Sequence, residues 1–222
     1  ANMAARMGVR YDEISIQHTF ESFKGTLAEE FKGRAEDTTE ENLQARIRGT
    51  TLMEFSNAFG HLLLTTGNKS EISVGYCTLY GDTNGGLGLL GDLYKTEVFA
   101  LSRHLNEVAG RELIPQVIID KEPSAELAPG QRDTDSLPPY PVLDEILKVL
   151  IEGERLSEAE LAHARAQVAQ LRQSAQGQAL VERIRGMIAR NEYKRRQAPP
   201  IIRVRSRAFG TGRQMPIAAK HH

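Results

Sequence analysis

The sequence predicts an α/β layered fold, in which helices pack against a sheet that contains parallel strands. Three observations predict it: an amphipathic helix is expected over residues 38–58, a short buried strand over residues 61–65, and a further helix from about Lys69. A glycine turn separates this strand from the helix that follows. Strand, glycine turn and helix in this order are typical of α/β proteins, which bind ligands at the carboxyl ends of their strands.

The size and composition fit one folded domain. The chain has 222 residues, of which 40% are apolar and 26% are charged, close to the average for globular proteins. No apolar run approaches the roughly 20 residues of a membrane span, and the first residues lack the apolar stretch of a signal peptide. Cys77 is the single cysteine, which excludes an internal disulfide and a cysteine-rich zinc site. We expect a soluble, cytoplasmic domain that binds no membrane.

Local signals set the expected bounds of the elements. Residues 10–16 have apolar side chains at positions 11, 14 and 16, and we expect them to form a strand. The sequence Thr38–Glu41 is a capping box that begins the first long helix, and Gly60 ends it. A helix over residues 95–109 is expected to stop at Gly110.

The second half of the chain is predicted to be mainly helical. Residues 120–139 form an irregular segment, in which Asp133 and Asp135 are expected to be solvated. Three helices follow: one from Pro141 to Gly153, one that begins at the capping box Ser157–Glu160, and one over about residues 179–197. We assign residues 141–200 to the helical C-terminal part of the same domain.

The charge is distributed unevenly along the chain. Residues 183–222 contain 11 basic residues and one acidic residue, a net charge of +10, while residues 1–182 contain 17 basic and 28 acidic residues, a net charge of −11. Opposite charges in one chain can reflect internal docking, a partner subunit or an anionic ligand. The basic segment contains only two aromatic residues, Tyr193 and Phe209, so we expect no binding to nucleic acid.

The most informative stretch is Leu64–Glu71. Its small hydroxyl and glycine residues let a ligand approach the backbone at the end of a strand, and the start of the following helix favours phosphate. Glu71 lies in the first turn of that helix, where it can receive a metal ion or an amide group, or act only as a charge at the helix N-terminus. The alternative interpretation of the whole stretch is a capped helix, with Ser70 or Asn68 as the cap.

A series of motifs resembles the synthetase domain of glutamine-dependent NAD synthetases. They occur in the order of that family: Glu41–Gly49, Leu64–Glu71, Val74–Asp82, Lys95-Thr96, Glu122–Leu127, Asp135–Tyr140, Asn191–Pro200 and Ser206–Gly210. The resemblance extends over nearly the whole chain. It identifies residues 1–222 as a partial NAD synthetase (ammonia-ligase) domain.

The resemblance implies a Rossmann-like, adenine-nucleotide-binding fold of the ATP pyrophosphatase type. It also implies a carbon–nitrogen ligase of NAD biosynthesis, which converts deamido-NAD (nicotinate adenine dinucleotide) to NAD with ATP, Mg²⁺ and ammonia. The reaction passes through an acyl-adenylate, and the ammonia comes from glutamine in the full enzyme. The expected partners are deamido-NAD, ATP, ammonia and a second copy of the chain, since the family is generally dimeric.

The resemblance assigns site residues, but no protein nucleophile, because the substrate carboxylate attacks ATP directly. The positions that correspond to ATP contacts are Thr66, Lys95 and Ser124. The positions that correspond to deamido-NAD contacts are Asn42, Arg46, Glu71 and Lys194, and Glu71 also corresponds to the acidic residue near the magnesium ion. Asn42 and Arg46 lie four residues apart on one helix face, so both can reach one ligand. Arg46 could instead form a surface ion pair, and Lys194 could belong to a solvated basic face.

Two parts of the family pattern do not occur in the sequence. There is no Ser-Gly-Gly-x-Asp-Ser loop to hold pyrophosphate, and no glutaminase domain with its cysteine nucleophile. Cys77 cannot replace that nucleophile, because we expect it to be a core thiol inside a helix. We therefore expect a domain that lacks its N-terminal strand and phosphate loop and is inactive alone. The alternatives are a catalytically incomplete nucleotide-binding or dimerisation module, and another ATP pyrophosphatase such as a GMP synthetase-like enzyme.

Overall fold

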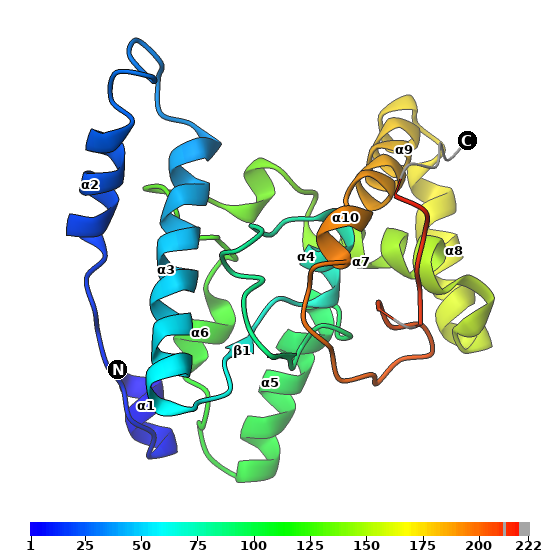
Figure 1. Ribbon diagram of the computed structural model, residues 1–222. Helices are drawn as coiled ribbons and strands as arrows, with labels where there is room; N and C mark the ends of the chain where they lie inside the picture. The colour runs from blue at the N-terminus through cyan, green and yellow to red at the C-terminus, as the bar shows by residue number, and fades with distance from the viewer. Residues whose placement is uncertain (211, 218–222) are drawn as a thin grey trace.

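A computed structural model describes residues 1–210 and 212–217 (Figure 1). Its N-terminal part consists of α1 (Asn2–Met7), α2 (Gln17–Thr26) and the long helix α3 (Thr38–Phe59), against which α2 packs. Residues 10–16 belong to no sheet, so the predicted strand there is wrong. No strand of the described residues lies beside them to take up their backbone groups, and Tyr11 and Ile14 stay about half exposed.

The residue that caps the N-terminus of α3 lies one position before the predicted one. Asp37, not Thr38, is the N-cap: its carboxylate accepts a hydrogen bond from the Thr39 amide at 2.7 Å, and its own amide donates to Glu40 at 2.8 Å. A carboxylate is favoured over a hydroxyl here because it also neutralises the positive end of the helix dipole. Gly60 ends α3 as predicted, with a φ of 68° that suits glycine.

The sheet is small and parallel. Strand β1 (Leu64–Thr65) pairs with β2 (Leu87–Gly88), with Leu64 opposite Leu87 and Thr65 opposite Gly88. Helix α4 (Lys69–Val74) follows β1 directly, so the predicted order of strand, turn and helix is confirmed. The strand predicted over residues 61–65 is nevertheless only two residues long. Helices, not strands, make up most of the regular structure described.

The remaining elements are helical, and most of them were predicted. Helix α5 (Lys95–Ala109) has the predicted bounds, with Gly110 as its C-cap. The others are α6 (Gln116–Asp120), a 3₁₀ turn (Asp133–Asp135), α7 (Tyr140–Leu147), a π-helical turn (Lys148–Glu152), a 3₁₀ turn (Gly153–Arg155), α8 (Glu158–Leu171), α9 (Ala175–Arg190) and α10 (Glu192–Arg195). The helix predicted over residues 179–197 thus begins earlier, and it divides into α9 and α10 at Asn191.

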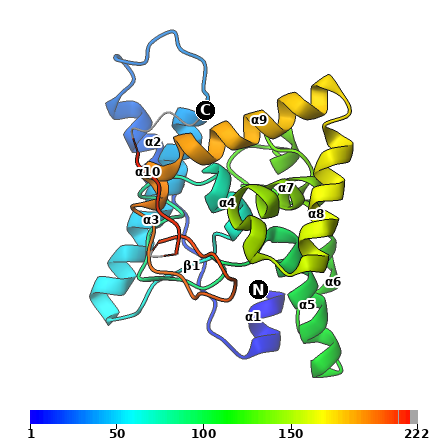
Figure 2. The ribbon, with the colours of Figure 1, turned by 90° about the vertical axis from the view of Figure 1, so that its right-hand side faces the viewer.

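Helix α7 lies at the centre of the hydrophobic core. It contacts α4, α5, α8 and α9, and Figure 2 shows it enclosed by these helices. Leu143, Ile146 and Leu147 are fully buried, and Ile151 continues their apolar face into the π-helical turn. This core holds α4, whose first turn carries Glu71, in a fixed position. None of the helices described is long and apolar enough to cross a bilayer.

A buried ion network holds the C-terminal segment against the core. Lys69, the first residue of α4, is fully buried, and its Nζ lies 2.8 Å from Asp92 Oδ1 and 3.1 Å from Glu152 Oε1. The second oxygen of Asp92 accepts hydrogen bonds from the amides of Val204 and Arg205 at 2.8 and 2.7 Å. The network therefore ties α4 to the chain near residue 205.

Arg205 completes this network from the basic end of the chain. Its guanidinium contacts Glu152 and Glu160, each at 2.7 Å, and also Glu97. Burial by itself raises the pKa of Glu152, but Lys69 and Arg205 outweigh it and lower that pKa overall. Of the three explanations for the uneven charge, internal docking is the one that these contacts support.

Candidate functional site

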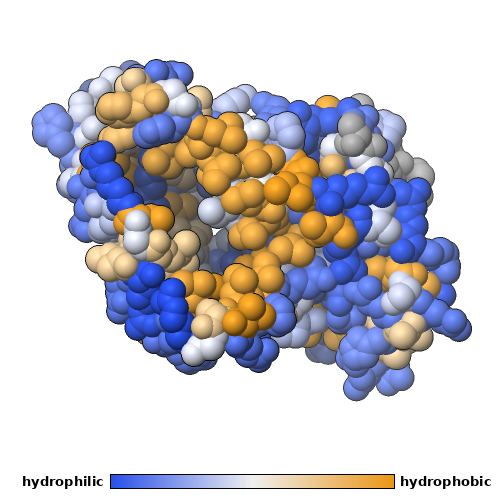
Figure 3. Space-filling model, turned by 90° about the horizontal axis from the view of Figure 1, so that it is seen from below, coloured by the Kyte–Doolittle hydropathy of each residue, from blue (hydrophilic) through white to orange (hydrophobic). Residues whose placement is uncertain are grey.

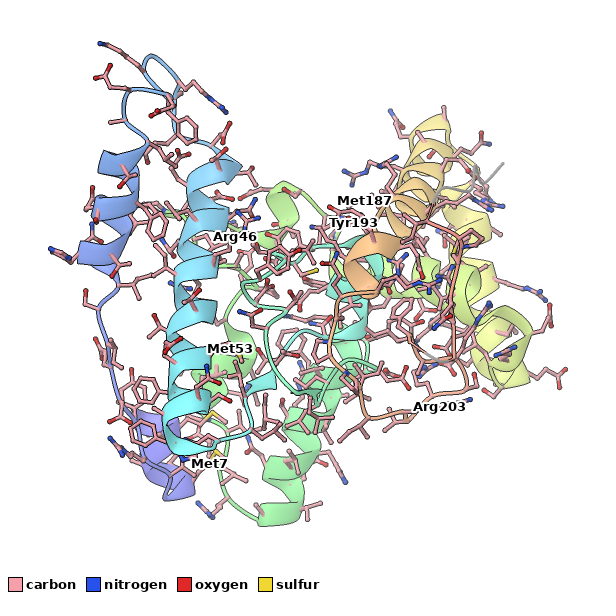
Figure 4. The ribbon with its side chains drawn as sticks, in the orientation of Figure 1. Met7, Arg46, Met53, Met187, Tyr193 and Arg203 are labelled. Atoms are coloured by element: carbon pink, nitrogen blue, oxygen red, sulfur yellow. The ribbon has the colours of Figure 1, made fainter. Side chains whose placement is uncertain are left out.

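Most of the predicted site residues surround one cavity of about 510 Å³. Its walls are α3, the end of β1 with the start of α4, the loop over residues 75–84, the segment over residues 124–136, and Lys194 on α10. Figure 4 shows Arg46 on α3 and Tyr193 on α10 on opposite sides of this region. A volume of this size is typical of small-molecule sites. Five of the seven predicted residues line it: Asn42, Thr66, Glu71, Ser124 and Lys194.

Glu71 is fixed at one wall by three interactions. Its amide donates to Asn68 Oδ1 at 3.0 Å and its Oε2 accepts from the Asn68 amide at 3.2 Å, which makes Asn68 the cap of α4. The other oxygen, Oε1, lies 2.9 Å from Lys95 Nζ, and both side chains are about four-fifths buried. The carboxylate is therefore oriented by the backbone and neutralised by a lysine before any ligand arrives.

Lys95 does not line the cavity itself, but it is positioned through the core. Its amide donates to Ser70 Oγ at 2.9 Å, and Ser70 donates to the buried carboxylate of Asp144 at 2.5 Å. Burial raises the pKa of Asp144, although hydrogen bonds from Ser70 and Thr96 oppose this shift. The Lys95 ammonium also lies 5.3 Å from the centre of the Tyr140 ring. These contacts hold Lys95 in place beside Glu71.

Lys194 reaches the cavity wall from α10 but is already engaged. Its Nζ donates to the carbonyl oxygens of Gly75 at 2.8 Å and Cys77 at 2.7 Å. Lysine has three donors, so one remains for a ligand. Lys194 is not part of a solvated basic face, because it stabilises the loop that follows α4.

Asn42 and Arg46 are both on α3, but the structure separates them. Asn42 lines the cavity, where its Oδ1 accepts a hydrogen bond from Thr78 Oγ1 at 2.8 Å. Its amide nitrogen remains as a donor. Arg46 does not line the cavity: its Nε donates to the Leu79 carbonyl at 3.2 Å, and its side chain is exposed. Spacing on the helix predicted that both side chains reach one ligand, but Arg46 contacts the carbonyl of Leu79 outside the cavity.

Two glycines allow the cavity walls to approach closely. A Cβ on Gly49 of α3 would lie 2.7 Å from the Gly81 carbonyl oxygen, so only glycine lets this helix contact the loop. Gly75 has a φ of 72°, and a Cβ there would lie 2.1 Å from the Asn191 side chain. The loop over residues 75–84 is thus held between α3 and the end of α9.

Asp133 is a cavity residue that the sequence interpretation missed. It was expected to be solvated, but it is only 3% exposed; Asp135 is exposed as expected. Tyr140 donates to Asp133 Oδ2 at 2.7 Å, and the other oxygen, Oδ1, is buried with no partner among the described residues. A buried carboxylate oxygen without a partner is costly, and here it belongs to a residue that lines the cavity. No local pattern indicated this, because the burial depends on the position of the segment in the cavity wall and on the contact with Tyr140.

Cys77 also lines the cavity, and its predicted helical position is wrong. It lies in the irregular loop after α4, partly buried. Burial raises the pKa of its thiol to about 12. Cys77 is therefore a neutral thiol at physiological pH.

A second, more open hollow adjoins the cavity. Its volume is about 680 Å³, and the segment over residues 121–132 forms most of its wall, with Gln44 and Arg48 of α3 opposite. Ser124 lies between the two hollows and lines both. The two hollows together form one recess, and Lys121 in the wall of the second hollow pairs with Glu126 of the same wall.

The residues described do not form a magnesium site by themselves. No cluster of three or more histidine, cysteine, aspartate or glutamate side chains with a geometry suited to a metal ion occurs in the part of the chain described. Both oxygens of Glu71 already have partners, Lys95 and the Asn68 amide. A site for Mg²⁺ needs several oxygen ligands, which this donor set does not supply.

Comparison with known proteins decides the family. A model of the family described as NAD synthase matches residues 1–198. The chain belongs to the NAD synthase family. Among its relatives, the glutamine-dependent NAD(+) synthetase of Thermotoga maritima is 47% identical over 215 residues, which are 97% of this chain and 35% of that protein. The chain thus spans about a third of the length of the curated relatives that it matches.

Solved structures agree with this assignment. The glutamine-dependent NAD+ synthetase of Acinetobacter baumannii, determined in complex with ADP, is 43% identical with a TM-score of 0.53; the match covers 97% of this chain and 36% of that one. The enzyme of Cytophaga hutchinsonii reaches a TM-score of 0.69 over 98% of this chain and 35% of its own, at 24% identity, and shows the fold alone. The chain is therefore a homologue of part of these enzymes and has the NAD synthase domain fold.

Proposed function

We propose that this chain is part of an enzyme that carries out the ATP-dependent amidation of deamido-NAD to NAD, and that the 222 residues alone do not catalyse the reaction. The observation that carries the proposal is that five of seven predicted contact residues, far apart in sequence, line one cavity. The names of the relatives support it, since those proteins are glutamine-dependent NAD synthetases. In the full enzyme, glutamine supplies the ammonia. We also propose that the enzyme is cytoplasmic and acts as a homodimer.

The proposed chemistry has two steps. The nicotinate carboxylate of deamido-NAD attacks the α-phosphorus of ATP, which forms an acyl-adenylate and releases pyrophosphate. Ammonia then adds to the acyl carbon, loses a proton and displaces AMP, which gives the amide of NAD. No protein nucleophile takes part, so the chain contributes by positioning two large anions and by stabilising charge.

We propose that deamido-NAD occupies the 510 Å³ cavity. Asn42 has a free amide donor there, Lys194 has one free ammonium donor, and Glu71 can accept from a hydroxyl or amide group of the ligand. Arg46 lies outside the cavity, so its role requires a ligand that extends past Leu79.

We propose that ATP binds in the recess in contact with Thr66 and Ser124. Thr66 is exposed at the end of β1, where its short side chain leaves room for a flat adenine ring. Ser124 lies between the two hollows, and its hydroxyl accepts only the Glu126 amide, at 3.0 Å. Lys95 supports this site indirectly, because its ammonium balances the negative charge of Glu71. No step of this proposal passes through Mg²⁺, because the donor set described does not fit the ion.

A catalytically incomplete binding module is the second candidate. The observation that favours it is that the 222 residues contain no Ser-Gly-Gly-x-Asp-Ser loop to hold departing pyrophosphate. This candidate predicts binding of deamido-NAD without turnover, even in the full-length polypeptide. The two candidates share the cavity and differ only in whether chemistry follows.

Calorimetric titration of the chain with deamido-NAD tests the proposed cavity. Asn42→Leu removes a donor inside the cavity, while Asn57→Leu makes the same change at an exposed position of the same helix. We expect the first variant to lose about tenfold in affinity, which is roughly 1.4 kcal/mol, and the second to bind like the wild type. Equal affinities for all three proteins would contradict the proposed location of deamido-NAD.

A further inference from the structure

The C-terminal end of α4 is buried, and side chains from a distant part of the chain bond to its carbonyl groups. The last turn of an α-helix leaves carbonyl oxygens without a partner inside the helix. Ser73, Val74 and Gly75 are buried, so water cannot satisfy them easily. The donors lie instead around the junction of α9 and α10, 117 or more residues later in the sequence.

Three side chains provide these donors: Asn191, Lys194 and Arg195. Asn191 Nδ2 donates to the Val74 carbonyl at 2.8 Å, and Arg195 Nη1 donates to the Ser73 carbonyl at 2.7 Å. Lys194 bonds to two carbonyls of the segment that follows. Two of the three side chains are cations, which also interact favourably with the negative end of the helix dipole.

Arg195 differs from the other two donors in its burial, since only 6% of it is exposed. Its Nε lies 3.0 Å from Glu192 Oε2, and its Nη2 donates to the Ile188 carbonyl. The Phe209 ring packs on the guanidinium, with its centre 5.1 Å away. One guanidinium thus contacts the end of α4, both C-terminal helices and the C-terminal segment.

The ion pair of Arg195 and Glu192 is unusual in its position. Charged side chains normally remain at the surface, as do the hydrophilic residues that cover much of the right-hand side of Figure 3. Glu192 is 2% exposed, and its other oxygen accepts from the Met215 amide at 3.1 Å. A well-packed apolar pair is often as stable as a buried ion pair, so stability alone does not explain these charges. An apolar side chain at position 195 could not bond to the Ser73 carbonyl.

We propose that Arg195 is a positioning residue of the cavity, which acts through the end of α4 and does not touch the ligand. Arg195 does not line the cavity. Helix α4 carries Glu71 in its first turn, and the loop over residues 75–84 follows its last turn, so a shift of α4 moves both parts of the wall. Lysine cannot replace arginine here, because only the planar, forked guanidinium bonds to Glu192 and Ser73 in fixed directions. The inference rests on the proposed binding of deamido-NAD in this cavity.

Hydrogen–deuterium exchange of the full-length polypeptide of the same gene tests the positioning without any ligand. Four amides after α4 donate hydrogen bonds to α4 or within the loop: those of Tyr76, Thr78, Gly81 and Asn84. We expect Arg195→Lys to make their exchange at least tenfold faster, with amides in α8 changed by less than twofold. Unchanged exchange at the four amides would overturn the proposal. An equal increase in α8 would also overturn it, because Arg195 would then only stabilise the domain as a whole.

The neighbouring arginine provides a matched control. Arg196 pairs with the same carboxylate, with its Nε 3.0 Å from Glu192 Oε1, but it is exposed and bonds to the Met215 carbonyl instead of α4. Arg196→Lys should therefore leave the exchange of the four amides within twofold of the wild type. Faster exchange in Arg196→Lys, equal to that in Arg195→Lys, would contradict a specific role of Arg195.

Calorimetric titration of the same full-length proteins with deamido-NAD tests the consequence for the cavity. We expect Arg195→Lys to lower the affinity at least tenfold and Arg196→Lys to bind within twofold of the wild type. Wild-type affinity in Arg195→Lys would overturn the proposal. If the wild type binds no deamido-NAD, the proposed function fails, and the exchange comparison alone decides whether Arg195 positions the loop.

A milder change tests the same contact if Arg195→Lys does not fold. Phe209→Leu keeps the arginine and all its hydrogen bonds but removes the ring that packs on the guanidinium. We expect the four amides to exchange at least threefold faster in this variant, with α8 changed by less than twofold. Phe23→Leu, at an exposed position of α2, should change neither. Wild-type exchange at the four amides in Phe209→Leu would overturn the proposal.

Discussion

The Lys95 ammonium lies 2.9 Å from Glu71 Oε1 and joins the start of α5 to the first turn of α4. Each residue is also fixed on its other side, Glu71 by the Asn68 cap and Lys95 by its amide bond to Ser70. The pair places a neutralised, oriented carboxylate at the cavity wall. A ligand that binds there meets side chains that are already ordered, so less conformational entropy is lost on binding.

Removal of the Glu71 charge should weaken binding more than folding. We expect Glu71→Gln to lower the affinity for deamido-NAD by about tenfold, because the substitution removes the fixed carboxylate acceptor and leaves the charge of Lys95 without its counter-ion. The melting temperature should fall by only a few degrees, since the amide oxygen of glutamine can still accept from the Asn68 amide and only the ion pair with Lys95 is lost. Calorimetry and thermal unfolding measure the two effects. Glu107→Gln, an exposed change in α5, is the control. A large loss of stability with unchanged affinity would show that Glu71 has only a structural role.

The size of the side chain at Thr66 should control nucleotide binding. We expect Thr66→Leu to lower the affinity for ATP at least tenfold, because the larger side chain fills the space at the end of β1. Thr66→Ser should bind ATP within about twofold of the wild type. Neither change should affect folding, since the side chain is exposed. Titration with ATP decides, and an unchanged affinity in Thr66→Leu would remove Thr66 from the proposed site.

Loss of the buried Lys69 charge should destabilise the whole domain. Lys69→Met leaves Asp92 and Glu152 buried without their main counter-charge, which typically costs about 3–5 kcal/mol. At roughly 2–4 °C per kcal/mol for a chain of this size, the melting temperature should fall by about 6–20 °C. Lys32→Met, at an exposed position, should have no effect. If calorimetry shows equal melting temperatures for the two variants, the network does not hold the C-terminal segment in place.

Ligand binding should protect Cys77 from alkylation. Its thiol has a pKa raised to about 12 by burial, so at pH 8 it should react with iodoacetamide far more slowly than a free cysteine does. Because Cys77 lines the cavity, saturating deamido-NAD should slow the reaction further. Mass spectrometry of the alkylated fraction over time gives both rates. A rate unaffected by deamido-NAD would place the ligand elsewhere.

Elements with a complete local signal could be predicted from the sequence. Helix α5 has its predicted bounds because its apolar spacing and Gly110 are both local, and Asn68 was one of the two caps considered for α4. Residues 10–16 have the pattern of a strand, but a strand needs a neighbour, and none is present among the residues described. Local pattern therefore predicts helices better than it predicts a sheet.

The candidate site shows the same limit. The resemblance in sequence indicated residues that come together in one cavity, but it could not show which of them are engaged by other groups. Arg46 is held by the Leu79 carbonyl, and Asp133 is buried by Tyr140, which follows it by seven residues across a turn. The burial of Lys69 could not be predicted either, because lysine is rarely buried unless it is paired, and its partners Asp92 and Glu152 are distant in sequence. In each case the deciding contact is tertiary.

The formation of NAD tests the central claim most directly. The 222-residue chain and the full-length polypeptide of the same gene are each supplied with deamido-NAD, ATP, Mg²⁺ and saturating ammonium, and NAD is measured by an enzymatic cycling assay. Ammonium removes any need for glutamine. Preorganised donors for a leaving group each contribute about 10²–10³ in rate, so the chain without its phosphate loop should form no measurable NAD, while the full-length polypeptide should turn over. Absence of NAD from the full-length polypeptide, or robust turnover by the 222-residue chain, would contradict the account.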